Sequence, residues 1–289
     1  MLKGRKGLVL GVANQRSIAM AIAHSAHHAG AEIALTYASE RFRQNVERLG
    51  MAIGSEIILP CDVSRDEEIT TVFERLRDRW GYLDFMVHAI AFANRNELNG
   101  AYLNTSRDGF RVAHDISVYS LTALTRAAFP LMQGRPGSIL TLSYIGAERV
   151  VPNYNVMGVS KAALEASVRY LAADLGPHGI RVNAISAGPI KTLSAAGVSN
   201  LSALLDVLPQ RSPLRRNVTA GEVGDAAVFL LSDMARAITG VTLYVDCGLH
   251  ILGVCDIACP DPSAHTECKA GIEPAARPEA GKPHPAASG

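Results

Sequence analysis

The sequence lacks an excess of charge of either sign. Its 289 residues include 28 Lys and Arg against 27 Asp and Glu, which gives a net charge of +1, and no basic tract is present. This balance argues against nucleic acid and against an anionic membrane surface as partners. The sequence also lacks a run of about 18 apolar residues, the length needed to cross a bilayer. The apolar run near the start ends at Asn14, too early for a signal peptide, and instead predicts a first strand.

Cysteine is scarce in the patterned part of the chain. Cys61 and Cys247 lie there, and free thiols are typical of a cytoplasmic protein. From Gly253 the sequence loses periodicity and holds six of the 14 prolines, so we expect 253–289 to be a disordered tail outside the fold. The tail contains four residues of metal-ligating types, which are Cys255, Cys259, His265 and Cys268. Their spacing matches no compact zinc pattern, so we interpret them as incidental and predict no metal.

Strand and helix patterns alternate along residues 1–252. Short apolar strands are expected at 8–12, 32–37, 56–59, 85–90, 138–143, 181–185 and 242–245. Helices are expected between them at 18–28, up to about 49, and at 67–80, 112–132, 155–175 and 223–232. This order predicts one α/β domain, a Rossmann-like doubly wound parallel sheet of seven strands with helices on both faces. Ligands of such sheets bind beyond the carboxyl ends of the strands.

The turn after the first strand lacks the G-x-G-x-x-G dinucleotide fingerprint. It nevertheless offers the same physical features. Gly11 permits a tight turn, Ala13 is small enough for close backbone approach, and Ser17 can cap the next helix and donate to a phosphate. Ala19 allows the helix to pack closely on the sheet. A plain strand-to-helix turn remains the alternative to a dinucleotide site.

The residues at the ends of the next strands favour a dinucleotide cofactor but do not distinguish NADH from NADPH. Asp62, after the third strand, can accept from an adenine amino group or can cap the following helix. The second strand ends at Ala38, with no acidic residue to hold a ribose 2′-hydroxyl. Arg41 and Arg43 follow, either as 2′-phosphate ligands or as a solvated helix face. These residues therefore leave the choice between NADH and NADPH open.

The sequence also lacks a tyrosine four residues before Lys161, the spacing of ordinary short-chain dehydrogenases. Met157 stands there, and Tyr154 lies seven residues before the lysine. At about 100° per residue, a helix would turn Tyr154 to the lysine's side but about one turn, roughly 5.4 Å, nearer the helix start. A ketone receives hydride and proton on one C=O, whereas an enoyl group receives hydride at Cβ and stabilises charge on a more distant oxygen. The longer spacing therefore favours reduction of a conjugated C=C bond.

Lys161 and two tyrosines form the predicted catalytic group. Lys161 would hydrogen-bond the nicotinamide ribose, and its charge would lower the pKa of Tyr154. Tyr154 would stabilise and protonate the enolate. Tyr144 stands beside Ser143 at the end of the fifth strand. It would be a second hydrogen-bond donor in the same pocket or would form part of the pocket wall. The alternative interpretation is that these tyrosines are half-buried structural aromatics.

These motifs resemble the bacterial NADH-dependent enoyl-acyl-carrier-protein reductases of fatty acid biosynthesis, in the short-chain dehydrogenase/reductase superfamily. The resemblance covers about residues 4–252 and is carried by GVANQRSIA, CDVS, AIAFAN, FRVAHDISVYS, TLSYIGAERVVPNYNVMGVSKAALEASVRYLA and RVNAISAGPIKTLSAAG. It implies catalytic Tyr144, Tyr154 and Lys161, substrate contact near Ala93, an acyl carrier protein as partner and a homotetramer. The implied cofactor contacts are Gly11, Ser17, Ile18, Ala38, Asp62, Val63, Ile90, Lys161, Ile190, Lys191, Thr192, Leu193 and Ser194.

The stretch from 193 to 208 is apolar and follows a Gly-Pro break. It is predicted to cover an acyl chain, although an ordinary amphipathic helix has the same pattern. An apolar acyl pocket is expected from Phe92, Tyr144, Met157, Leu193 and Leu201. Many relatives carry basic residues on this segment, whereas Ser199, Ser202 and Ala203 stand here. Carrier docking would then be weak, or would rely on other basic residues such as Lys191, Arg211, Arg215 or Arg216.

Two further functions remain open from the sequence. A carbonyl-reducing member of the fold would require activity on a 3-ketoacyl thioester, and Met157 argues against it. A dinucleotide-binding sensor or scaffold would show no turnover, and the Tyr154–Lys161 pair argues against that. The favoured function is reduction by NADH of the trans-2 C=C bond of enoyl-acyl-carrier-protein thioesters.

Overall fold

The computed structural model describes residues 1–192 and 201–253, without the side chains of 201–204. The chain divides into a compact unit, Met1–Ile251, and a second unit, Leu252–Gly289, of which the first two residues are described. The expected tail with Cys255, Cys259, His265 and Cys268 lies outside the described residues. So do Leu193, Ser194, Ser199 and the side chains of Leu201, Ser202 and Ala203.

Seven parallel strands form one sheet in the order β3-β2-β1-β4-β5-β6-β7. The strands are β1 (Lys6–Leu10), β2 (Glu32–Tyr37), β3 (Ile57–Pro60), β4 (Phe85–His88), β5 (Gly137–Ser143), β6 (Ile180–Ala187) and β7 (Thr242–Val245). β1 pairs with β2 on one side and with β4 on the other, so the strand order reverses between β1 and β4. Loops that leave two such strands diverge and open a crevice at the carboxyl edge of the sheet.

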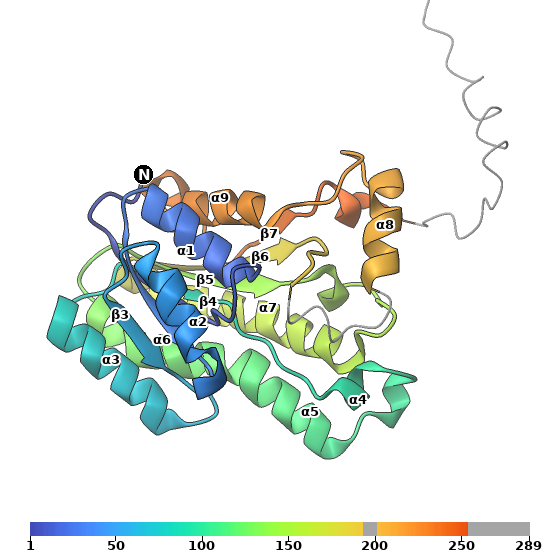
Figure 1. The fold of residues 1–289 in the computed structure, drawn as a ribbon, viewed down its shortest axis with the longest axis horizontal. Coiled ribbons are helices and arrows are strands. Elements are labelled where there is room, and N and C mark those ends of the chain that lie inside the picture. The colour runs from blue at the N-terminus through green and yellow to red at the C-terminus, as the bar shows by residue number, and fades with distance from the viewer. Residues whose placement is uncertain (193–200, 254–289) are drawn as a thin grey trace, which may run out of the picture. The chain divides into compact units, whose positions relative to one another are not determined.

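Helices cover both faces of this sheet (Figure 1). They are α1 (Ile18–His28), α2 (Glu40–Met51), α3 (Asp66–Trp80), α4 (Arg95–Leu98), α5 (Arg107–His114), α6 (Ser120–Met132), α7 (Asn155–Leu175), α8 (Leu201–Arg211) and α9 (Ala220–Leu231). Single turns lie at Tyr102–Asn104, Ile145–Ala147, Gly176–His178, Asp233–Ala235 and Leu249–Ile251, and a π-helical segment at Asp115–Tyr119. α1, α2 and α9 pack on one face, and α3, α6 and α7 pack on the other.

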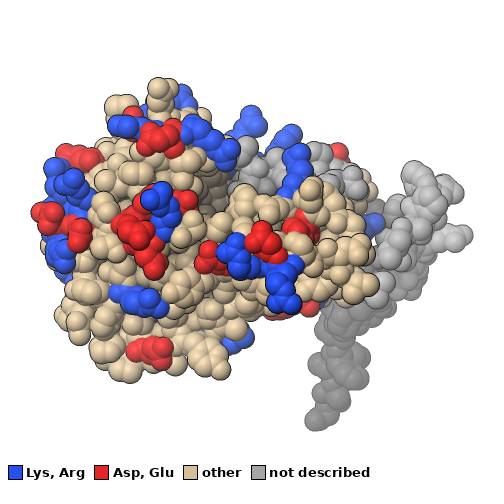
Figure 2. All heavy atoms as spheres, turned by 90° about the horizontal axis from the view of Figure 1, so that it is seen from below, with Lys and Arg blue, Asp and Glu red and all other residues tan. Residues whose placement is uncertain are grey.

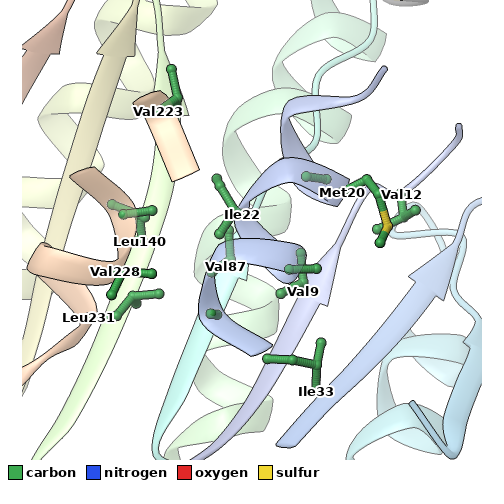
Figure 3. Close-up of a cluster of buried hydrophobic side chains, with 14 of the residues drawn as sticks. Val9, Val12, Met20, Ile22, Ile33, Val87, Leu140, Val223, Val228 and Leu231 are labelled. Carbon is green, nitrogen blue, oxygen red and sulfur yellow. The ribbon is translucent and has the colours of Figure 1, made fainter. Parts of the chain in front are cut away.

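The alternation of side chains along the strands creates two separate cores. Along β1, Val9 points into the cluster under α1 and α9, whereas Leu8 and Leu10 point into the cluster under α3, α6 and α7. Figure 3 shows the first cluster, where Ile22 of α1 and Val228 of α9 lie over the strands. Fully burying one such side chain contributes about 1.5–3 kcal/mol. The two apolar layers hold the sheet rigid, so the loops at its carboxyl edge start from fixed positions.

Most of the expected elements are confirmed, and one expected helix is interrupted. The helix predicted at 112–132 consists of α5, the π-helical segment and α6. A single π turn adds one residue to a turn and barely changes the apolar pattern, so the sequence did not show it. The expected first strand, 8–12, is β1 at Lys6–Leu10, because Gly11 turns away with a φ of 90°. α4 was not expected.

Acidic and basic side chains are interspersed on the face shown in Figure 2, and neither sign forms a continuous stripe. Within 1–192 and 201–253, no helix combines the length and the apolar character that spanning a membrane requires.

Candidate active site

Tyr144, Tyr154 and Lys161 come from two neighbouring elements at the carboxyl edge of the sheet. Tyr144 follows β5 directly, Tyr154 is the N-cap residue of α7, and Lys161 lies two turns into that helix. The two tyrosine rings meet edge to face, with centroids 4.9 Å apart and an interplanar angle of 66°. The structure therefore brings the two predicted tyrosines together, in a contact that structural aromatics also make.

Tyr154 lies at the start of the helix rather than inside it. α7 begins at Asn155, and Tyr154 has a φ of −109°. Its neighbours Asn153 and Asn155 have φ values of 61° and 34°, in the left-handed region that asparagine tolerates better than most residues. The helical-phase argument for the seven-residue spacing is therefore wrong in detail. The turn before the helix, and not a full helical turn, displaces the tyrosine from the lysine.

Two glycines make room for the ring of Tyr154. A Cβ atom at Gly146 would lie 2.5 Å from Cδ1 of Tyr154. A Cβ atom at Gly158 would lie 2.7 Å from the carbonyl oxygen of Gly146. Both distances are shorter than van der Waals contact. The Ile145–Ala147 turn can therefore pack closely against α7 only because both positions are glycine.

Lys161 is buried, with 5% of its surface exposed. Its Nζ donates to the carbonyl oxygen of Leu142, at 2.7 Å. Burial lowers the pKa of Lys161 to about 8, and the charge of Glu165 acts in the opposite direction. At neutral pH the ammonium form therefore predominates, as a ribose-binding cation requires.

The tyrosines respond to burial in the opposite direction. Burial raises the pKa of Tyr144 to about 12. Burial also raises the pKa of Tyr154 above its ordinary value, and Tyr144 adds to the shift. The expectation that Lys161 lowers the pKa of Tyr154 is wrong for this structure, because desolvation dominates. Tyr154 is thus a neutral phenol at neutral pH, with its proton available to donate.

Met157 and Ala93, both predicted to contact the substrate, belong to one small apolar cluster. Met157 is buried in a small cluster with Leu98, Ala113 and Val156, and Ala93 and Tyr154 pack against it. Phe92, predicted to line the acyl pocket, is 47% exposed. The π-helical segment fixes this loop, because the backbone N–H of Phe92 donates to Ser117 Oγ at 2.9 Å.

The turn between β1 and α1 has the expected local structure. A Cβ atom at Gly11 would lie 2.1 Å from the carbonyl oxygen of Ala89, so this turn requires glycine. Ser17 caps α1, accepting from the N–H of Met20 at 3.2 Å. Its hydroxyl donates to the carbonyl oxygen of Asn14, at 2.7 Å, so it would have to rotate to donate to a phosphate. Ile18 opens the helix and is half-buried.

Other predicted cofactor residues follow their strands as expected. Ala38 is exposed just after β2, and Ile90 is half-buried after β4. Asp62 Oδ1 accepts from the backbone N–H and the hydroxyl of Ser64, at 3.0 and 2.7 Å. Asp62 therefore closes a turn and is not the N-cap of α3, which is Arg65. Val63 is buried beside it.

The loop after β6 is described as far as residue 192. Ile190 packs against the core under α1 and α9, Lys191 is exposed, and Thr192 is half-buried. Among the expected docking residues, Arg216 forms an ion pair with Glu222, and Arg215 donates to the carbonyl oxygen of Gln210. The pairing of Arg216 makes it a poor candidate for carrier docking.

Comparison with known proteins places this arrangement in a family. A family model described as Enoyl-(Acyl carrier protein) reductase matches residues 11–250. The chain belongs to the enoyl-acyl-carrier-protein reductase family. Enoyl-acyl-carrier-protein reductase (NADH) FabI of Bacillus cereus is 56% identical over 255 residues, which are 88% of this chain and 99% of the relative. FabI of Aquifex aeolicus is 52% identical over 254 residues, 88% of this chain and 94% of the relative.

Solved structures of enoyl-acyl-carrier-protein reductases have the same fold. The Aquifex aeolicus enzyme matches with a TM-score of 0.86 at 52% identity, over 88% of this chain and 99% of that chain. The Bacillus cereus enzyme, in complex with NADP+ and indole naphthyridinone, matches with a TM-score of 0.86 at 56% identity and the same coverage. The predicted family and the doubly wound fold are confirmed, and the chain is an oxidoreductase as the sequence predicts.

Sequence reasoning missed two buried polar groups of this reductase. Ser143 Oγ donates to Glu165 Oε1, and both residues are buried. The ring of His88 lies between the hydroxyls of Thr141 and Ser120, each 2.8 Å from a ring nitrogen. Burial, followed by the charge of Lys161, lowers the pKa of His88 to about 3, so this histidine is neutral. Their partners are 22 to 53 residues away in the chain, and no local pattern indicates such pairs.

Proposed function

We propose that this chain reduces the trans-2 C=C bond of enoyl thioesters on acyl carrier protein with hydride from NADH, the last reductive step of fatty acid elongation. The observation that carries the proposal is the contact of Tyr154 with Tyr144 at the start of α7, the helix that holds the buried Lys161 two turns further on. The position of an ordinary dehydrogenase tyrosine holds Met157. Membership of the family supports the reaction class.

The residues present fit a nicotinamide dinucleotide. Gly11 allows the chain to turn sharply at the point where the strand order reverses, and the first turn of α1 contains no acidic residue that would repel a phosphate. When bound, NADH supplies the hydride. Lys161 would hold the nicotinamide ribose through hydrogen bonds from its ammonium group.

Tyr154 would act on the substrate oxygen and not on the carbon that receives the hydride. As hydride reaches Cβ of the enoyl thioester, negative charge develops on the thioester oxygen. The neutral phenol of Tyr154 donates a hydrogen bond to that enolate oxygen and can supply its proton. Tyr144, also neutral, would line the same pocket as a second donor or wall. Ala93, Met157 and Leu201 would contact the acyl chain.

The surroundings of β2 support NADH as the preferred cofactor. Arg43 pairs with Glu47 at 2.8 Å and with Glu40 at 3.7 Å, which leaves it poorly placed to bind a 2′-phosphate. Arg41 lies over the ring of Phe42 at 4.5 Å. The Bacillus cereus structure contains NADP+, so the same fold also accepts the phosphorylated cofactor. NADPH is accordingly expected to be used, but less well.

The protein would work as a homotetramer in the cytoplasm. Large apolar side chains are exposed on the faces of α5 and α7, among them Phe110 at 40% and Tyr170 at 76%. A subunit contact on these helices would cover both side chains. Cys61 and Cys247 are buried free thiols, which fits a reducing compartment. Exposed Lys191 remains available to meet an acidic carrier protein.

The experiment that tests the proposed function compares two substrates. NADH oxidation at 340 nm is followed with crotonyl thioester and with acetoacetyl thioester, and both assays are repeated with NADPH. We expect turnover of the crotonyl substrate alone, faster with NADH. Turnover of the acetoacetyl substrate alone would replace the proposal with carbonyl reduction, and binding of NADH without any turnover would favour a sensor.

A further inference from the structure

A buried carboxyl group lies directly behind the candidate catalytic residues. Glu165 is 7% exposed and follows Lys161 by four residues in α7, so the two side chains leave the same face of the helix. Ser143, which is 6% exposed, donates its hydroxyl hydrogen to Glu165 Oε1. Ser143 is the last residue of β5, and Tyr144 follows it. One carboxyl group thus connects the element that presents Tyr144 to the helix that carries Lys161.

Lys161 needs such a neighbour because a buried cation without a counter-charge is costly. Its ammonium donates to one backbone carbonyl, and its positive charge acts on His88 of β4, which is neutral. The groups around Glu165 are Glu148 after the Ile145–Ala147 turn, Arg169 of α7 and Tyr244 of β7, which donates to Glu148. Among these groups, Glu165 is the one whose charge favours protonated Lys161.

We propose that Glu165 is a positioning residue for the reaction, which keeps Lys161 charged inside the protein and fixes Ser143 so that Tyr144 faces the substrate. The inference rests on the proposed function and extends it to a residue that touches neither substrate nor cofactor. Burial raises the pKa of Glu165, whereas the hydrogen bond from Ser143 and the charges of Arg169 and Lys161 act against the rise. A hydroxyl that donates to a carboxyl oxygen favours the ionised form, which is the form that this role requires.

Two variants separate the charge of Glu165 from its hydrogen bond. Glu165→Gln keeps the shape and an acceptor for Ser143 but removes the charge. Ser143→Ala removes the hydrogen bond and keeps the charge. Asp174→Asn, at an exposed position on the same helix, controls for loss of one negative charge from α7.

The first readout is the titration of Lys161, which does not depend on turnover. It is followed by NMR of ¹³Cε-labelled lysines, with the signal assigned by its loss in Lys161→Arg. We expect the midpoint to fall by about one pH unit in Glu165→Gln, the size of shift that removal of a nearby opposite charge produces. Ser143→Ala and Asp174→Asn are expected to leave the midpoint within a few tenths of a unit of wild type.

The second readout is the pH profile of kcat/KM on crotonyl thioester. The alkaline limb should move to lower pH by the same amount in Glu165→Gln. In Ser143→Ala the alkaline limb should stay at the wild-type pH while kcat falls, because the hydrogen bond from Ser143 to Glu165 no longer fixes the position of Tyr144. Glu165→Asp, which restores the charge, should return the Lys161 midpoint toward wild type.

An unchanged Lys161 midpoint in Glu165→Gln would overturn the inference. Equal shifts in Glu165→Gln and Glu165→Asp would assign the effect to packing and would overturn it as well. If wild type binds NADH but does not reduce crotonyl thioester, the proposed function fails, and the NMR titration still decides the role of Glu165.

Discussion

Burial favours the neutral form of both Tyr154 and Lys161, but the two residues need different charge states. The phenol must keep its proton until charge develops on the substrate, and its raised pKa ensures this. The lysine must stay charged to hold a ribose, and burial opposes that. Both conditions would hold together at a pH below about 8.

The first prediction concerns the hydroxyl of Tyr154. Tyr154→Phe is expected to lower kcat by about 10²-fold or more, the usual loss when a positioned proton donor is removed. The NADH dissociation constant should change little, because Lys161 and the strand ends bind the cofactor. Stopped-flow turnover and NADH fluorescence titration measure the two quantities. Tyr170→Phe, an exposed tyrosine of the same helix, is the matched control, and equal losses in both variants would contradict the role of Tyr154.

The second prediction concerns pH. Lys161 is protonated below its pKa of about 8 and loses its charge above it, so NADH should bind more weakly as pH rises from 7 to 9. Lys161→Arg stays charged over this range and should show no such weakening. The dissociation constant measured across the range for both proteins checks this. A wild-type affinity that rises or stays constant with pH would contradict the assignment.

For helices and strands with strong local signals, the first and last residues could be predicted from the sequence. Helix 18–28 is preceded by a capping serine, and helix 155–175 and strands 32–37 and 242–245 have uninterrupted patterns and match the structure. The turn at Gly11 and the helix cap at Ser17 were predictable for the same reason, because both are local features. The position of Tyr154 was less predictable, since it depends on the turn at Asn153 and not on helical phase.

Features that depend on contacts between distant elements could not be read from the sequence. Ser117, in the π-helical segment, accepts from the backbone N–H of Phe92, 25 residues away in the chain. Glu165 has the helical spacing of the buried face of α7, four residues after Lys161 and three before Val168, but nothing local shows that its carboxyl group meets Ser143. The pKa of Tyr154 was misjudged because burial cannot be estimated from the neighbouring residue types alone.

The third prediction tests the packing of α7 against the Ile145–Ala147 turn. Gly146→Ala places a methyl group against the rigid ring of Tyr154, so the ring must move. Activity on crotonyl thioester is expected to fall by at least about tenfold, since small displacements of a catalytic group are costly. Gly176→Ala, where a Cβ atom meets open space, should keep wild-type activity. Full activity of Gly146→Ala with unaltered circular dichroism would show that the ring position is unimportant.

The whole molecule is nearly neutral and exposes apolar side chains, which favours association. The fourth prediction is a mass in solution of about four times the 30.7 kDa chain, measured by light scattering after size exclusion. Tyr170→Glu is expected to reduce that mass by placing a charge on the exposed face of α7. Met234→Glu, exposed at 64% on another element, should leave it unchanged. A monomeric wild type would contradict the proposed tetramer.

The most direct test of the central claim is the destination of the hydride. Crotonyl thioester is reduced with NADH that carries deuterium at the transferred position, and the product is examined by NMR. The account predicts one deuterium at the β-carbon of a butyryl thioester and a solvent proton at the α-carbon. Deuterium on a carbon bearing a hydroxyl group, formed from acetoacetyl thioester while crotonyl thioester is left unreduced, would contradict it.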